Sequence, residues 1–151
     1  MHYFAYGTLL VEDAMRSVCP SARNVGFMRL EGFELSFGKC SMDGVAGCTL
    51  LPKEGAVTYG IQYELTDEDM AKMDGAAHVE EAQWVHVPVT LVDAEGRSVP
   101  SSTYFIPGEF RPWAPTDAYV APILKGLNEC DFPEEYKTRA REIIATAQKN
   151  H

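Results

Sequence analysis

The stretch FAYGTLL, residues 4–10, decides how the chain begins to fold. An apolar run that ends on Tyr6, Gly7 and Thr8 and then resumes with two leucines predicts a short strand followed by a tight turn. One glycine and no lysine exclude a phosphate-binding loop of the usual kind. Because glycine has no Cβ, the backbone here can approach another group closely. The turn is therefore either a candidate binding site or only the end of a strand.

Length and charge limit the class of protein. A chain of 151 residues with 46% hydrophobic residues can bury a core of its own. We expect one domain over residues 1–151, with residues 141–151 as the tail of the last helix. The formal net charge of -9 argues against a basic nucleic-acid-binding surface. Without a bilayer-length apolar run or a secretory leader, we expect a cytoplasmic protein with no membrane segment.

The four cysteines do not indicate a metal or redox site. They are scattered, and none belongs to a C-x-x-C motif or lies near a pair of histidines (Cys19, Cys40, Cys48, Cys130). Buried free thiols are the simplest interpretation. We therefore expect no metal.

Strand patterns dominate the first hundred residues. They predict two strands within residues 25–37, broken near Glu31, and a hairpin whose turn is Pro52–Gly55. Two more strands are expected over residues 83–92 and 99–106, with Pro88 at an edge or bulge.

Helix signals are fewer and come mostly late in the chain. A capping box that starts at Thr66 predicts a short helix to about Met73. Two further helices are expected, from Thr116 to about Leu127 and from Pro133 onward. The fold class is therefore α+β, and the regular βαβ alternation of a nucleotide-binding sheet is absent from the pattern.

Three ordered segments resemble the γ-glutamylcyclotransferase family, also called AIG2-like. FAYGTLL is similar to the opening F-x-Y-G-(S/T)-(N/L)-L of that family. GVAGCTLLPKEGAVTYGIQYELTDEDMAKMD resembles its strand–turn–strand–helix segment, and PTDAYVAPILKGLNECDFPEEY resembles its tail. The resemblance runs from residue 3 to about residue 140 and implies a small mixed β-barrel flanked by helices.

The resemblance also implies a reaction. The α-amine of a small γ-glutamyl compound attacks its own γ-carbonyl, which yields 5-oxoproline and a free amine in an acyl transfer. No cofactor is needed, because the nucleophile is tethered to its target. The turn after the first strand is expected to hold the substrate, so Tyr6, Gly7, Thr8 and Leu9 are the candidate binding residues. Tyr119 matches a tyrosine that lines the family's pocket.

At the expected catalytic position, the chain departs from the pattern. The family carries a general acid/base glutamate in "LD-x-x-E-G", and the corresponding segment here is Met73-Asp74-Gly75-Ala76-Ala77-His78. Ala77 therefore stands at the glutamate position, and a methyl group cannot transfer a proton. His78 replaces the glycine.

Three explanations of Ala77 remain open. The chain is a natural non-catalytic member, an inactivated variant of an active enzyme, or an enzyme in which Glu80 or Glu81 acts instead. An extended chain spans about 10 Å over the three residues from Ala77 to Glu80, so Glu80 or Glu81 could act in place of the missing glutamate only if the loop bulges. The sequence thus leaves a cyclotransferase, a binding module for a γ-glutamyl-like small molecule, and a pure scaffold as alternatives.

The sequence does not fix the leaving amine or the oligomeric state. The loop from Pro107 to Pro115 carries Arg111 and Trp113, which are candidates for contact with the leaving group. Closing one end of the barrel is the alternative role of both side chains.

Overall fold

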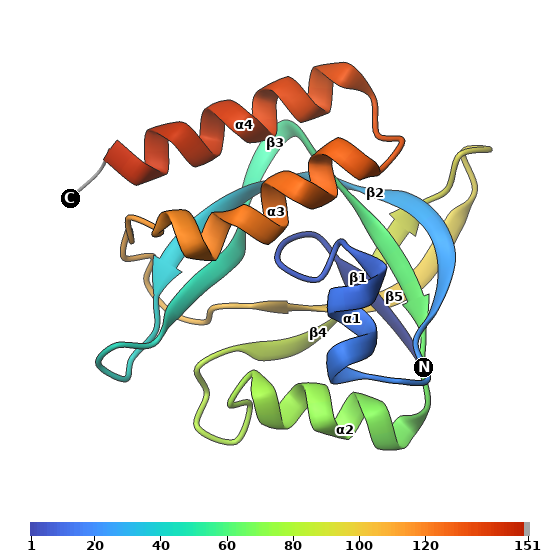
Figure 1. The fold of residues 1–151 in the computed structure, drawn as a ribbon, viewed down its shortest axis with the longest axis horizontal. Coiled ribbons are helices and arrows are strands. Elements are labelled where there is room, and N and C mark those ends of the chain that lie inside the picture. Colours follow the sequence, from blue (N-terminus) through green and yellow to red (C-terminus); the bar gives the residue numbers. More distant parts are fainter. Residues whose placement is uncertain (150–151) are drawn as a thin grey trace.

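A computed structural model describes residues 1–149, so the last two residues of the expected helical tail, 150 and 151, lie outside the described residues. Five strands and four helices follow one another in the order β1 (His2–Ala5), α1 (Glu12–Val18), β2 (Arg23–Lys39), β3 (Ala46–Glu64), α2 (Asp67–Ala76), β4 (Val85–Val92), β5 (Ser98–Phe105), α3 (Asp117–Glu129) and α4 (Glu134–Lys149). Helices α3 and α4 lie along one side of a strongly curved sheet, and α2 lies on the opposite side (Figure 1). The α+β class is confirmed.

The sheet has the strand order β1-β3-β2-β4-β5 and only antiparallel pairs. Its centre is one long hairpin of β2 and β3, joined by a short turn in which the Cys40 N–H donates to the Val45 carbonyl at 2.8 Å. The hairpin predicted around residues 52–55 is therefore wrong, because those residues lie within β3.

A bulge explains why the sequence suggested breaks that the structure does not have. Glu31 pairs with Val57, and Phe33 pairs with Pro52. Residues 53–56 of β3 therefore lie opposite the single residue Gly32 of β2 and have no paired partners. Gly32 and Gly55 have φ values of 85° and 80°, which only glycine adopts readily. The turn-forming composition marks a bulge that bends two continuous strands, instead of ending them.

The two edge strands, β1 and β5, come together through side chains. The Ser102 Oγ donates to the His2 carbonyl at 2.6 Å, the Thr103 Oγ1 to the Phe4 carbonyl at 2.8 Å, and the Tyr6 hydroxyl to the Tyr104 carbonyl at 2.7 Å. These bonds satisfy edge carbonyls that have no strand partner. The small barrel expected from the sequence is thus an open antiparallel sheet whose two edges are linked by side-chain hydroxyl groups.

Pro88 lies in β4, which pairs with β5 along its whole length but meets β2 only where Arg29 faces Val92. The missing N–H of proline therefore costs the sheet little on the open side of this strand. β4 is therefore not an edge strand, but its β2-facing side is unpaired at Pro88, which is the local edge that the sequence predicted.

Helix α2 begins at the predicted cap. The Thr66 hydroxyl accepts from the Asp69 N–H at 3.1 Å, and the helix continues about one turn beyond the expected end. Hydrogen bonds from the Ser21 hydroxyl and amide lower the pKa of Asp69, and the nearby Lys72 ammonium acts in the same direction. Asp69 thus ties α2 to the segment that follows α1.

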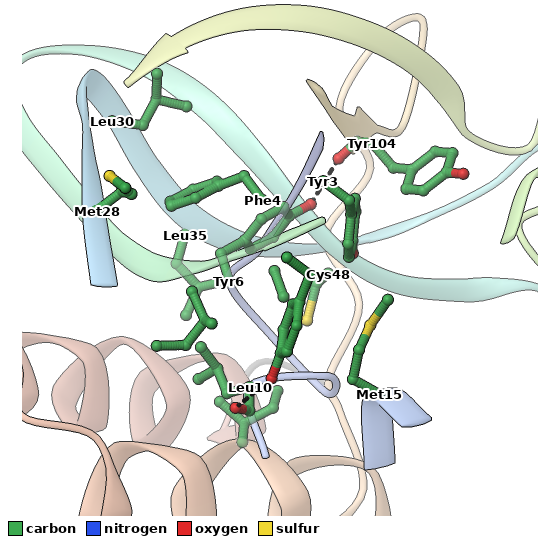
Figure 2. Close-up of a cluster of buried hydrophobic side chains, with 14 of the residues drawn as sticks. Tyr3, Phe4, Tyr6, Leu10, Met15, Met28, Leu30, Leu35, Cys48 and Tyr104 are labelled. Atoms are coloured by element: carbon green, nitrogen blue, oxygen red, sulfur yellow. Dashed lines mark hydrogen bonds between the residues drawn. The ribbon is translucent and has the colours of Figure 1, made fainter. Parts of the chain in front are cut away.

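The core lies between the concave sheet and the helices. Aromatic residues from β1 fill much of it, and Figure 2 shows Phe4 and Tyr6 among Met28, Leu30 and Leu35. Gly126 of α3 packs directly on Leu10, since a Cβ there would lie 2.5 Å from the Leu10 Cβ. The turn after β1 is therefore clamped between the sheet and α3. Among residues 1–149, no helix is both long and apolar enough to cross a membrane.

Candidate active site

A cavity of about 290 Å³ opens between the end of β1, the end of α2 and the start of α3. Residues from seven regions of the chain line it: Tyr3, Tyr6, Gly7, Thr8, Leu9, Val18, Cys48, Met73, Ala76, Ala77, Trp84, Tyr104 and Tyr119. All six of the predicted positions Tyr6, Gly7, Thr8, Leu9, Ala77 and Tyr119 are among them. None of these lining residues carries a charged side chain.

The wall formed by residues 6–9 is a tight turn. The Leu10 N–H donates to the Gly7 carbonyl at 3.3 Å, which closes the turn. Within residues 1–149, the Leu9 N–H has no acceptor, and the Thr8 N–H has only the weak sulfur acceptor of Cys48. Two main-chain donors at a cavity are suited to binding a carboxylate or a developing oxyanion.

Glycine is required at position 7 because the Cys48 side chain packs against its backbone. A Cβ on Gly7 would lie 2.8 Å from the Cys48 Sγ and 3.4 Å from its Cβ. The close approach expected from the sequence is therefore made by the Cys48 thiol, which lies beside the turn in Figure 2.

Tyr119 and Trp84 form hydrogen bonds with the two backbone groups of Cys48. The Tyr119 hydroxyl accepts from the Cys48 N–H at 2.8 Å, and the Trp84 Nε1–H donates to the Cys48 carbonyl at 3.0 Å. Both rings reach this peptide because Gly47 has no side chain; a Cβ there would lie 2.6 Å from the Tyr119 hydroxyl. The small residues before Cys48 thus fix the position of two aromatic walls.

The titratable groups of the cavity are neutral at physiological pH. Burial raises the pKa of the Cys48 thiol to about 12, and hydrogen bonds from Tyr119 and from the Thr8 backbone offset only part of the rise. Burial also raises the pKa of Tyr6, Tyr104 and Tyr119 far above the ordinary phenol value. The cavity therefore offers hydroxyls, a thiol and main-chain amides, but no ionised lining group.

Ala77 lies at the C-terminal end of α2, where the helix meets the cavity. Its N–H donates to the Met73 carbonyl at 2.9 Å, and Met73 and Ala76 line the same wall. A longer side chain at position 77 would start from the cavity wall. His78, at the position of the family's glycine, has a φ of 50°, in the left-handed region that favours glycine.

The two neighbouring glutamates do not line this cavity. Glu80 is exposed, and Glu81 is exposed beside His78, with its Oε2 3.8 Å from the His78 Nδ1. The structure therefore brings Ala77, but not Glu81, to the turn of residues 6–9.

Arg111 and Trp113 also lie outside the cavity lining. The Arg111 guanidinium donates to the Cys40 carbonyl and thus fastens the Pro107–Pro115 loop to the β2–β3 turn. The Trp113 ring packs edge-on against Tyr119, with 5.0 Å between the centroids. Of the two roles left open by the sequence, this placement favours structural closure.

Cys48, Trp84 and Tyr104 are three of the seven cavity residues that were not predicted as site residues from the sequence. Each lies on a strand or just before one, where the alternating pattern fits core packing equally well. Tyr104 has the most notable contact, because its hydroxyl donates to the Asp74 Oδ1 at 2.5 Å. Asp74 and Ala77 are three residues apart on α2, and so neighbours on its surface.

Comparison with known proteins identifies the family. The family description "Gamma-glutamyl cyclotransferase, AIG2-like" matches residues 3–122, and the chain belongs to this family. Gamma-glutamylcyclotransferases from Bos taurus and Homo sapiens are 26% and 25% identical over 146 residues, which cover 93% of this chain and 77% of each relative.

Solved structures show the same fold. A gamma-glutamyl cyclotransferase superposes with a TM-score of 0.85 at 22% identity, with 99% of both chains covered. An uncharacterized Homo sapiens protein superposes with a TM-score of 0.84 at 24% identity, with 93% of this chain and 85% of that one covered. YkqA from Bacillus subtilis superposes at 0.76 with 19% identity, over 95% of this chain and 54% of its own.

Proposed function

We propose that the chain is a cofactor-free cytoplasmic acyltransferase-type protein that binds small γ-glutamyl compounds and forms 5-oxoproline slowly. Its slowness follows from Ala77, which stands where the family pattern has a glutamate. Membership of the γ-glutamyl cyclotransferase family supports the substrate class. The observation that carries the proposal is the convergence of the turn 6–9, Tyr119 and position 77 on one cavity.

The cavity is suited to the ring-closing reaction. The Thr8 and Leu9 amides would bind the γ-glutamyl group, and apolar walls would hold it bent, so that its α-amine lies near its own γ-carbonyl. Such tethering supplies much of the rate enhancement without a cofactor. The α-amine is protonated at neutral pH, however, and a group that accepts its proton accelerates a reaction of this kind about 100- to 10,000-fold. Ala77 cannot provide that acceleration.

Restoring a carboxyl tests this proposal. We expect Ala77→Glu to raise 5-oxoproline release from γ-glutamylbenzylamide at least about 100-fold over the parent chain. The apolar benzylamine suits the uncharged lining near Val18, Met73 and Trp84. Ala76→Glu is the matched control, since it adds the same carboxyl to the same wall one residue away. Equal activity of both variants and the parent would contradict the assigned role of position 77.

A non-catalytic binding role is the second candidate. The absence of an ionised group among the described lining residues favours it, because binding through main-chain amides requires no acid or base. Under this alternative, 5-oxoproline binds to the parent chain and no γ-glutamyl compound is converted. Calorimetric titration with 5-oxoproline, alongside the release assay, distinguishes the two functions.

A further inference from the structure

A chain of polar side chains leads from the cavity to the protein surface. The Tyr104 hydroxyl donates to the Asp74 Oδ1 at 2.5 Å, and the His86 Nδ1 lies 3.3 Å from the same oxygen. Beyond it, the His86 Nε2 lies 2.6 Å from the Ser102 Oγ. Tyr104 lines the cavity, whereas the side chains of His86 and Asp74 are 19% and 37% exposed. The contacts thus connect the cavity wall with solvent.

The hydrogen-bond directions orient the outer end of this chain. Ser102 donates its only hydroxyl hydrogen to the His2 carbonyl, so the His86 Nε2 donates to the Ser102 Oγ. The other ring nitrogen, Nδ1, faces the Asp74 Oδ1 at 3.3 Å, so a proton held by either group can pass to the other.

The relay also lies at the right place on α2. Asp74 precedes Ala77 by three residues, which puts the two side chains on adjacent positions of one helix face. The Tyr104 and His86 rings stack against each other, with 5.0 Å between their centroids, and this packing fixes the geometry of both. A carboxyl group is thus coupled to the cavity even though position 77 has none.

We propose that Tyr104, Asp74 and His86 form a proton relay between the cavity and solvent, which serves the ring closure in place of a carboxyl at position 77. This inference rests on the proposed function. Tyr104 is the member that faces the substrate, and Asp74 and His86 act through it.

The proton balance of the reaction fits the relay. One proton leaves the substrate ammonium for the Tyr104 oxygen, while the hydroxyl proton of Tyr104 moves to the Asp74 carboxyl. The proton on Asp74 then reaches solvent through His86. The free amine then forms the N–C bond to the γ-carbon. The second N–H proton returns by way of Tyr104 to the leaving nitrogen as the old C–N bond breaks. Tyr104 keeps its own proton between steps, since burial and Asp74 both raise its pKa.

The test measures 5-oxoproline release from γ-glutamylbenzylamide by the parent chain and by single variants. We expect Asp74→Asn and Tyr104→Phe each to lower kcat at least about 100-fold, with KM changed by less than about two-fold. His86→Gln should lower kcat less, because it acts one step further from the substrate. Asp67→Asn is the control: it makes the same exchange on the exposed start of α2. A solvent deuterium isotope effect on kcat is expected in the parent and is smaller in Asp74→Asn.

The outcomes separate the relay from the proposed function. A parent chain that binds 5-oxoproline but releases none above the rate without enzyme, while Ala77→Glu is active, overturns the relay together with the slow turnover of the parent, and favours the non-catalytic binding role. The relay alone is overturned if the parent is active and Asp74→Asn, folded by its melting curve, keeps the kcat of Asp67→Asn. If neither the parent nor Ala77→Glu binds or converts the substrate, the proposed function fails, and the relay fails with it.

Discussion

The contact between Gly7 and Cys48 allows a quantitative test of why the first turn carries a glycine. A Cβ on Gly7 would lie 2.8 Å from the Cys48 Sγ, closer than side-chain carbons approach sulfur in folded proteins. Both residues are buried, so neither can move into solvent. Overpacking of this kind costs about 1–3 kcal/mol, and we expect Gly7→Ala to lower the free energy of unfolding by that amount.

A double-mutant cycle isolates the cause. Cys48→Ala removes the sulfur and leaves the Cβ of residue 48 at 3.4 Å from the new methyl group, an ordinary contact distance. In that background, Gly7→Ala should cost less than about 0.5 kcal/mol, because the unfolded-state entropy gain of about 0.4–1 kcal/mol offsets the remaining strain.

Urea unfolding of the parent, both single variants and the double variant gives the coupling free energy directly. We expect at least about 1 kcal/mol of coupling between the two positions. If Gly7→Ala costs the same with cysteine and with alanine at position 48, steric conflict with the thiol is not the reason for the glycine.

Three further predictions concern stability. His78→Gly should raise the free energy of unfolding by about 1 kcal/mol, because the left-handed φ at position 78 strains any residue that has a Cβ. The control Ala71→Gly, inside α2, should lower the free energy of unfolding by about 1 kcal/mol, and urea unfolding measures both variants. Tyr119→Phe removes the acceptor of the Cys48 N–H and should cost about 1–3 kcal/mol in the same assay, and an unchanged midpoint would contradict this bond. The folded-state pKa of Asp69 is lowered, so Asp69 stabilises the protein above the ordinary carboxyl pKa and loses this effect as the pH falls. The melting temperature of Asp69→Asn should therefore lie below the parent's at about pH 6 and approach it at about pH 3, and a constant gap would rule out the linkage.

Local signals in the sequence predicted most of the elements. The Thr66 cap, the late helices and the unpaired side of β4 at Pro88 all depend on neighbours within a few residues, and the structure confirms them. The break at Glu31 and the turn at Pro52–Gly55 were wrong because a bulge and a turn use the same residue types. Only the pairing of β2 with β3 decides between them.

The candidate site was partly predictable for the same reason. Motif resemblance pointed to the turn 6–9, to Ala77 and to Tyr119, and the structure places all of them on one cavity. It could not indicate that Cys48 would occupy the space beside Gly7, since the two residues are 41 positions apart along the chain. The contact of Tyr104 with Asp74 spans 30 residues and depends on how β5 passes α2.

The measurement that most directly tests the central claim is a titration of the ¹⁵N-labelled chain with 5-oxoproline, followed through its amide resonances. If the turn after β1 binds the γ-glutamyl group, the Thr8 and Leu9 amide signals shift most and saturate together, and the exposed amides of α4 stay in place. Saturable shifts confined to another surface, with Thr8 and Leu9 unmoved, would contradict the account.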